Sequence, residues 1–461
     1  MTDSTDSTAA PAGFGERYAL RGGVSSVRLS DGRTSLFCDR YAETLGVLGE
    51  ADLAILTALS DRPYTPAELA EIAGPGAGWL LRALREGGWL VLTVTRDGTD
   101  LYRMQPLRPP PSPPPGDDGG EPRLSRFAVL RAGGTGMVAE SPLAWCDVEV
   151  LDPAVLAEIG GYAGRAGGSA FPDELRARVR RDLRWAGLLV DAGAEEDLRS
   201  RQWSPHELWF HTRSTRDERA HLGEGFAGTH WAKGVHDPLP ARPEPYPGPA
   251  VALPEPDTER MADPGLTAVL ARRRSVREHD NERPLTAARL GEFLHRGVRV
   301  TGETELDGIG YARRPYPSGG GAHELELYPI VSTVDGVAPG MYHYDAHEHV
   351  LRPVSPIGAP PVRRLLRHVR RATGEPPTEP QVVFVVAARV GRVMWKYERM
   401  AYALTLKHVG VLYQTLYCVA TAMELAPCGL GTAEPAAFAE ASGRDPLIET
   451  MVGGFLLGTR R

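Results

Sequence analysis

The feature that most constrains this chain is the apolar stretch at residues 404–426. Apolar residues occupy nearly every face of its helical period, which predicts a helix buried inside a domain or a dimer. The stretch also contains the polar side chains Lys407, His408, Gln414 and Glu424. A bilayer core tolerates such side chains poorly, so we expect a protein interior and no membrane span. The following sequence PCGLG predicts a glycine-rich turn that ends the helix.

Two proline-rich segments divide the chain, at residues 106–122 and 237–257. Proline at this density favours extended backbone and cannot build a core, so both are predicted to be semi-rigid linkers. They leave three candidate domains, at residues 15–105, 123–236 and 258–461. A chain of 461 residues with 42% apolar content can supply that many cores.

The first candidate domain has the outline of a winged helix. Asp31-Gly32 lies between two β-prone runs and predicts a hairpin. Three helices are predicted. The first spans residues 50–59, the second begins at the capping box Thr65-Pro66-Ala67-Glu68, and the third ends at Glu86. The sequence WLVLTV at residues 89–94 predicts a strand that closes the domain.

The second candidate domain repeats part of the first. Residues 84–91 (LREGGWLV) and 183–190 (LRWAGLLV) agree at five positions. Residues 127–140 resemble a hairpin at the corresponding place upstream. We therefore interpret the two domains as copies of one winged-helix-like module.

Charge weighs against DNA as the ligand of these modules. Residues 1–120 contain 16 Asp or Glu residues against 11 Arg and no Lys. Phosphate contacts supply most of the affinity for DNA, so an acidic module would repel it. The same outline can pair a peptide with an open strand edge, or the modules can simply pack against the third domain. Both alternatives stay open.

The overall composition suits a cytoplasmic protein. The net charge of -7 gives no general attraction to nucleic acid or to anionic membranes. The four cysteines (Cys38, Cys146, Cys418 and Cys428) form no C-x-x-C pair. We therefore expect neither a disulfide scaffold nor a structural zinc site. We expect a reducing compartment. The polar, acidic N-terminus lacks the form of a signal peptide.

Two motifs of the third candidate domain suit a phosphate-bearing ligand. Residues 272–277 (RRRSVR) group guanidiniums around a hydroxyl, and arginine binds phosphate oxygens bidentately. A solvated charge run is the alternative. The three glycines of residues 314–321 (RPYPSGGG) let backbone approach a ligand, although such a sequence also forms ordinary turns. Three nearby histidines form no recognised ligand pattern, so no metal site is predicted.

The pair Lys396-Tyr397 is a candidate acid–base site. The chain contains only three lysines, Lys233, Lys396 and Lys407, because arginine supplies its other basic side chains. A lysine desolvated beside Trp395 could act as a base. The alternative is a snorkelling lysine beside a surface tyrosine.

Several of these segments together resemble the SagB/ThcOx-type azoline dehydrogenases, a branch of the nitroreductase superfamily. They are RRRSVRE, RPYPSGG followed by HELELYPIV, MWKYERMAYALTLKHVGVLYQTLY and APCGLG. QWSPHELWFHTRS at residues 202–214 and GTHWAKG at 228–234 also resemble that family. The resemblance is strongest over residues 200–461.

The resemblance implies an α+β chain with a nitroreductase-like, three-layer α/β/α FMN domain at its C-terminal end. It also implies a homodimer with FMN at the subunit interface and peptide-binding modules upstream. Members oxidise thiazolines and oxazolines to thiazoles and oxazoles in ribosomally made precursor peptides, so a cyclodehydratase is an expected partner.

The resemblance also assigns site residues. Lys396 and Tyr397 match a pair that handles the substrate proton. The residues expected to bind FMN are Arg273, Arg274, Ser275, Arg277, Pro317, Ser318, Gly319, Gly320, Gln414, Gly429, Leu430, Gly431 and Arg460. Of these, the residues of the arginine motif and Arg460 are expected at the phosphate, and the others along the isoalloxazine. Two departures stand out: the family suggests an acidic residue at Gly454 and a glycine-rich continuation at residues 432–434.

The leading hypothesis is an FMN-dependent azoline dehydrogenase. One rival is an NAD(P)H-dependent nitro- or quinone reductase on the same scaffold, which needs neither the modules nor the Lys-Tyr pair. The other is a leader-peptide- or DNA-binding regulator with a vestigial flavin domain.

Overall fold

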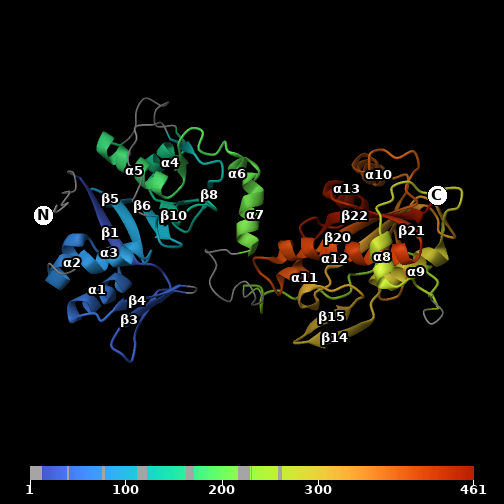
Figure 1. Cartoon of the computed structure of the whole chain (residues 1–461), viewed down its shortest axis with the longest axis horizontal. Coiled ribbons are helices and arrows are strands. Elements are labelled where there is room, and N and C mark those ends of the chain that lie inside the picture. Colours follow the sequence, from blue (N-terminus) through green and yellow to red (C-terminus); the bar gives the residue numbers. More distant parts are fainter. Residues whose placement is uncertain are drawn as a thin grey trace. The chain divides into compact units, whose positions relative to one another are not determined.

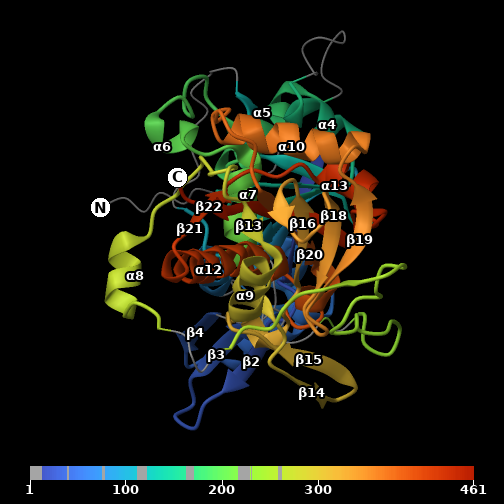
Figure 2. The same cartoon turned by 90° about the vertical axis from the view of Figure 1, so that its right-hand side faces the viewer.

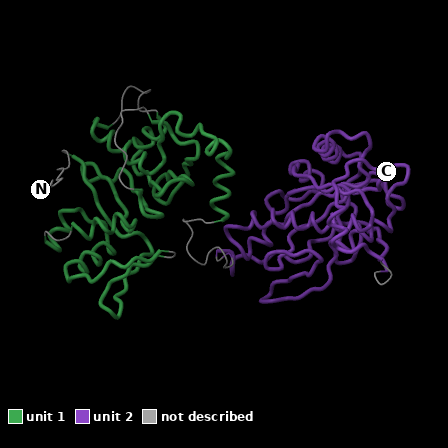
Figure 3. Tube along the Cα trace, in the orientation of Figure 1, with its two compact units in different colours: residues 1–222 green, residues 223–461 purple. Residues whose placement is uncertain are grey.

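The computed structural model describes residues 13–38, 41–74, 78–111, 122–161, 171–215, 229, 231–257 and 262–461. The chain divides into two compact units, residues 1–222 and 223–461 (Figure 3). Parts of three predictions lie outside the described residues: the N-terminal sequence at 1–12, the middle of the first proline-rich segment at 112–121, and Gly228 with His230.

Unit 1 mixes short strands and helices (Figure 1). Its elements are β1 (Phe14–Leu20), β2 (Ser25–Arg28), β3 (Thr34–Cys38), β4 (Tyr41–Gly46), α1 (Glu50–Asp61), α2 (Pro66–Ala73), α3 (Gly78–Glu86), β5 (Leu90–Arg96), β6 (Thr99–Pro106), β7 (Arg123–Leu124), β8 (Val129–Ala132), β9 (Met137–Glu140), β10 (Cys146–Val150), α4 (Pro153–Ile159), α5 (Asp173–Trp185), β11 (Leu189–Val190), α6 (Leu198–Arg201) and α7 (Pro205–Thr215).

The elements predicted for the first candidate domain are confirmed. β2 and β3 form the antiparallel hairpin around Asp31-Gly32. The Thr65 hydroxyl accepts the N–H of Glu68 at 3.2 Å, and the Glu68 carboxylate accepts the N–H of Thr65 at 2.7 Å. This reciprocal cap begins α2 at the predicted place. Ile55, Leu59 and Leu84 then pack into one core with other residues of α1, α2 and α3.

The sequence repeat corresponds to a repeated backbone turn. After α3, the N–H of Trp89 bonds the carbonyl of Leu84 at 2.8 Å, and Gly88 has a φ of 73°. After α5, the N–H of Leu188 bonds the carbonyl of Leu183 at 2.9 Å, and Gly187 has a φ of 77°. Both helices therefore end in the same left-handed glycine turn, which explains why the glycine recurs.

One antiparallel sheet runs through both candidate modules, in the order β1-β5-β6-β10-β9-β8. β6 of the first module pairs with β10 of the second over five residue pairs, from Cys146 opposite Pro106 to Val150 opposite Tyr102. Tyr102 and Met104 of β6 are also part of the core that α5 covers. Classification as two winged helices, with boundaries at 15–105 and 123–236, stays a prediction.

Unit 2 is built on a seven-stranded sheet (Figure 1). Its elements are β12 (Val251–Ala252), α8 (Leu266–Arg272), β13 (Leu285–Thr286), α9 (Ala287–Val298), β14 (Gly302–Leu306), β15 (Ile309–Arg313), a 3₁₀ turn (Gly319–Gly321), β16 (Leu325–Val331), β17 (Val334–Asp335), β18 (Gly340–Asp345), β19 (Val350–Pro356), α10 (Pro360–Ala372), β20 (Val382–Arg389), α11 (Val390–Met394), α12 (Ala401–Ala422), β21 (Leu425–Leu430), α13 (Pro435–Ser442) and β22 (Glu449–Thr459).

Successive side chains of β20 alternate between two hydrophobic cores, and this alternation shows the layers of the unit. The sheet order is β12-β19-β18-β16-β20-β22-β21, and every residue of β20 is buried, as predicted. Val382 and Phe384 belong to the core with α9 and α12, whereas Val383 and Val385 belong to the core with α10 and α13. Helices thus cover both faces of the sheet, and the predicted three-layer α/β/α fold is confirmed for this unit. The hairpin β14–β15 projects from its body (Figure 2).

The long apolar helix exists, but its predicted end is wrong. α12 stops at Ala422, and Glu424 has a φ of 56°. The PCGLG sequence then lies mostly on β21, an edge strand that pairs with β22, rather than on a turn. Pro427 is tolerated there because an edge strand can do without one N–H. None of the described helices is long and apolar enough to cross a membrane.

The second proline-rich segment contains the short strand β12 and is not the semi-rigid linker that was predicted. β12 pairs with β19, and Leu253 is buried in the core of unit 2. Arg242 forms ion pairs with Asp345 and Glu348. Backbone pairing and burial of Leu253 attach this segment to the sheet, which composition alone does not reveal.

Candidate functional site

A glycine loop between β15 and β16 forms the first part of the candidate site. Gly320, Gly321 and His323 have φ values of 61°, 67° and 44°, so the chain turns through three left-handed residues within four positions. Glycine adopts this conformation without the steric cost of a β-carbon. Pro317 is exposed at the start of the loop. Ser318 closes it from within, because its hydroxyl accepts the N–H of His323 at 3.0 Å.

The predicted Lys-Tyr pair meets this loop. Lys396 Nζ donates to the carbonyl of Gly320 at 2.8 Å and lies 4.7 Å from the ring centroid of Tyr311. A β-carbon on Gly320 would lie 2.6 Å from Lys396 Cδ and 3.1 Å from the Tyr397 hydroxyl. The structure therefore brings Lys396, Tyr397 and Gly320 together. Lys396 is partly exposed. A single chain therefore does not provide the removal of water from its amine that the sequence had suggested.

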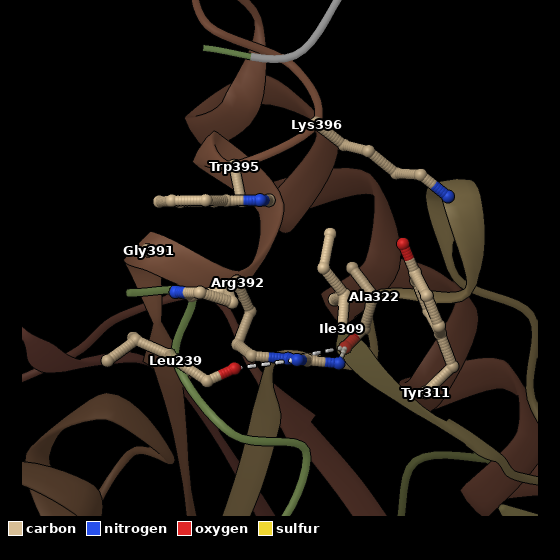
Figure 4. A pocket seen from close by; sticks show the side chains of 9 residues that line it. Leu239, Ile309, Tyr311, Ala322, Gly391, Arg392, Trp395 and Lys396 are labelled. Carbon is tan, nitrogen blue, oxygen red and sulfur yellow. Dashed lines mark hydrogen bonds between the residues drawn. The ribbon is translucent and has the colours of Figure 1, made fainter. Parts of the chain in front are cut away.

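Arg392 supports the loop from below (Figure 4). Its guanidinium donates to the carbonyls of Ala322, Leu239 and Gly310 at 2.9, 2.8 and 3.0 Å. Burial lowers the pKa of Arg392 to about 10. The space beside Arg392, Trp395 and Lys396 measures only about 10 Å³, which suits one water at most. It is a packing gap under Lys396 and not a substrate cleft.

His408 on α12 supports the loop from inside the unit. Its Nε2 accepts the N–H of Gly319 at 2.7 Å, and its Nδ1 lies 2.7 Å from Glu324 Oε1. The Ser318 hydroxyl donates to the other oxygen of Glu324 at 3.3 Å. His408 and Glu324 are both buried, and their hydrogen bonds offset the cost of burying polar groups.

The arginine motif forms the second part of the candidate site. The hydroxyls of Ser275 and Tyr417 lie 2.8 Å apart, and Tyr417 accepts the N–H of Gly429 at 2.7 Å. The Arg273 guanidinium lies 5.2 Å from the centroid of the Tyr417 ring. Arg274 instead donates to the carbonyls of Ala271 and Arg273, so it turns back on its own segment.

Two further groups lie near this motif. Burial raises the pKa of the Cys428 thiol, and the nearby Arg277 guanidinium opposes the rise. Arg460 Nε donates to the carbonyl of Leu425 at 2.8 Å, while its Nη2 is buried with no hydrogen-bond partner among the described residues. Arg460 lines a cavity of about 520 Å³ with Arg272, Arg283 and Arg289. An anion such as a phosphate would satisfy the buried Nη2.

α12 connects the two parts. His408 contacts the glycine loop and Tyr417 contacts the arginine motif. The two residues are nine positions apart, which corresponds to roughly 13.5 Å along a helix, so an elongated ligand could reach both. Gln414 is exposed, on the face of α12 that carries Lys407, and its amide donates to Cys418 Sγ at 3.5 Å. No hydrogen bond among the described residues joins Gln414 to either part.

The other residues expected at the flavin lie on or next to β21. The carbonyl of Leu430 accepts the Tyr413 hydroxyl at 3.0 Å, and a β-carbon on Gly431 would meet open space. Gly454, where an acidic residue was expected, donates its N–H to Tyr413 at 2.6 Å. A β-carbon on Gly454 would lie 3.1 Å from Leu430 Cδ1. A side chain at position 454 would therefore require Leu430 to shift.

The sequence reasoning missed His408, Glu324, Tyr417 and Arg392. A signal existed for one of them: a histidine inside an apolar helix requires a polar partner. The partner itself lies 84 positions away, so only folding identifies it. Among the described residues, no cluster of His, Cys, Asp and Glu could hold a metal ion.

Comparison with known proteins agrees with this arrangement. Residues 270–459 match the model of the nitroreductase family, and residues 122–220 match that of the cyanobactin oxidase ThcOx. A protein of Methanocaldococcus jannaschii described as a nitroreductase is 29% identical over 185 residues, which cover 40% of this chain and 82% of that protein.

Two solved structures are similar at lower identity. One, described as a nitroreductase from Anabaena variabilis, is 22% identical, with 54% of this chain and 45% of that chain covered and a TM-score of 0.39. The other is the Escherichia coli microcin synthetase McbBCD complex with truncated pro-MccB17 bound; it is 18% identical, with 47% and 77% covered and a TM-score of 0.36. Residues 270–459 are therefore similar to the nitroreductase family, and residues 122–220 are similar to the cyanobactin oxidase ThcOx.

Proposed function

We propose that this protein is an FMN-dependent dehydrogenase that oxidises thiazoline or oxazoline rings of a ribosomally made precursor peptide to thiazoles or oxazoles. The observation that carries the proposal is the contact of Lys396 with the glycine loop, where Nζ lies 2.8 Å from the Gly320 carbonyl and Tyr397 is adjacent. The ThcOx match at residues 122–220 supports the substrate class.

FMN would extend along α12. Arg273, Ser275, Arg277 and Arg460 would hold its phosphate, with Arg274 at the margin. The glycine loop, Gln414 and residues 429–431 would border its ring. The unpartnered Nη2 of Arg460 fits an anionic group. FMN, when bound, supplies the acceptor for the hydride that leaves the azoline.

Lys396 is the candidate base. Its hydrogen bond to Gly320 holds the amine at the edge of the loop. In the neutral form, its lone pair takes the proton from the azoline carbon, and Tyr397 orients the amine from the same side. Loss of a proton and a hydride leaves an aromatic ring. Aromaticity favours the product, so the main task of the enzyme is alignment.

The peptide would bind unit 1. β8 is the last strand of the six-stranded sheet, and all its residues are exposed. Such an edge can pair with an extended leader segment. A cyclodehydratase would supply the azolines. The four cysteines form no C-x-x-C pair, which suits a reducing cytoplasm.

The enzyme would act as a homodimer with FMN at the interface. Tyr402 and Leu406 on α12 are 46% and 40% exposed, and Gln414 shares the exposed side of that helix. Leu266 and Leu270 on α8 are exposed as well. A second copy covering this side would also desolvate the neighbourhood of the flavin.

The decisive test combines two measurements on the purified protein. Visible spectroscopy should show flavin bands, and mass spectrometry of an azoline peptide should show a loss of about two mass units per ring. Absence of flavin after reconstitution would remove the basis for the phosphate assignment. Flavin without any mass change would contradict the substrate assignment.

The Lys396→Ala variant tests the base. We expect it to keep FMN and to lose at least about 100-fold in the rate of azole formation, because a positioned general base contributes that much. Lys233→Ala, which removes another exposed lysine of unit 2, is the matched control and should keep full activity. Equal rates in both variants would show that Lys396 is not the base.

The nitroreductase match favours a second candidate, an NAD(P)H-dependent reductase. That activity predicts rapid bleaching of the bound flavin by NADPH. Slow bleaching together with azole formation would favour the dehydrogenase.

A further inference from the structure

The strongest unassigned feature is the buried pair of Glu324 and His408 behind the glycine loop. Both residues are buried, with 5% of His408 and none of Glu324 exposed, and neither takes part in the chemistry proposed above. The imidazole bridges two partners on opposite sides, the Gly319 amide at 2.7 Å and the Glu324 carboxylate at 2.7 Å.

The partners fix the form of the ring. The amide of Gly319 is a donor, so the Nε2 that faces it must be an acceptor and carry no proton. We assign the proton to Nδ1, which then donates to Glu324, an arrangement in which a carboxylate sets the histidine tautomer. The opposite tautomer would direct two N–H groups at each other and push the loop away.

The loop is therefore clamped at adjacent residues from two sides. His408 holds the N–H of Gly319, and Lys396 is bound to the carbonyl of Gly320. The loop also holds Lys396 in place, because a shift of the loop would move the Gly320 carbonyl that accepts its hydrogen bond. Ser318 also connects the loop to Glu324, since its hydroxyl donates to that carboxylate and accepts the N–H of His323.

We infer that Glu324 and His408 are positioning residues that set the glycine loop and, through it, the place of Lys396. The inference rests on the proposed function for its kinetic readout. It requires an Nε2 that carries no proton and accepts the N–H of Gly319.

Two substitutions separate the two hydrogen bonds of His408. His408→Gln can place an amide oxygen near the position of Nε2 and keep the acceptor for Gly319. His408→Asn can place its amide nearer Nδ1, which keeps a donor for Glu324 and removes the acceptor. If His408 only filled space, the two variants would behave alike.

The full-length variants would be compared by hydrogen exchange of the loop amides and by steady-state kinetics on an azoline peptide. His408→Asn should raise the exchange of the Gly319 amide and lower kcat by about tenfold, the effect of one lost hydrogen bond, with KM unchanged. His408→Gln should stay within about threefold of the wild type in both. Unchanged loop exchange in His408→Asn, or an equal loss in both variants, would overturn the inference.

Nitrogen NMR of the wild-type protein with labelled histidine provides a test that needs no folded variant. The His408 ring should appear as the Nδ1–H tautomer, and an Nε2–H signal would overturn the inference. The exchange and NMR results do not depend on the reaction. If the wild type fails to oxidise azolines, the proposed function fails and the clamp is still judged by these two measurements.

Discussion

At the residue scale, Gly320 is the most constrained position of the candidate site. Its φ of 61° disfavours any side chain, and a β-carbon would collide with Lys396 Cδ at 2.6 Å. The glycine is thus required for two separate reasons, the turn and the space that the Lys-Tyr pair occupies.

The two reasons can be separated by experiment. Gly308 has a φ of 73° and open space around its α-carbon, so Gly308→Ala should lose only about 1–2 kcal/mol of stability from backbone strain. Gly320→Ala should show a similar loss plus a fall of at least about tenfold in azole formation, because Lys396 must move. Thermal melts and turnover rates check both. Unimpaired turnover in Gly320→Ala would mean that Lys396 need not stay where it is.

At the element scale, α12 organises the site because it carries contacts to both the glycine loop and the arginine motif. Two tyrosines one turn apart illustrate this. Tyr413 bonds Gly454 and Leu430 of the sheet, whereas Tyr417 bonds Gly429 and also Ser275 of the arginine motif. The two side chains carry the same hydroxyl group but bond different partners.

Removing each hydroxyl should therefore have different consequences. Tyr413→Phe and Tyr417→Phe should each cost about 1–3 kcal/mol of stability, since each leaves a glycine N–H without its acceptor. Only Tyr417→Phe should also weaken FMN binding, by about tenfold, because it releases Ser275. Chemical denaturation and fluorescence titration with FMN measure the two effects. A weaker FMN affinity in both variants would argue against a specific role for Tyr417.

At the scale of the whole molecule, the exposed apolar side of α12 requires a cover. Tyr402 and Leu406 are large apolar side chains on a helix whose opposite side lies in the core. The homodimer proposed above would cover these side chains and Gln414, which is also exposed.

Leu406→Arg should therefore produce monomers in light scattering and reduce FMN occupancy, because a guanidinium would be buried in the interface. Leu306→Arg changes an equally apolar residue at the tip of the β14–β15 hairpin and should leave the assembly intact. A dimer that persists unchanged in Leu406→Arg would place the interface elsewhere or exclude it.

The sequence by itself determined the local elements. Glycine turns, the Thr65–Glu68 cap and the apolar run of β20 each act over a few residues, so their signals are contained in the segments that form them. The pattern of motifs also predicted a nitroreductase-like domain, which residues 270–459 match, and a Lys-Tyr pair, whose two residues meet at Gly320.

Tertiary structure alone decided the rest. PCGLG resembles a turn, yet pairing with β22 makes most of it an edge strand, and pairing with β19 attaches part of a proline-rich segment to the sheet. The clamp on the glycine loop joins His408 to Glu324 across 84 positions. Such contacts depend on which distant groups the fold brings within hydrogen-bond distance, and no local pattern encodes that choice.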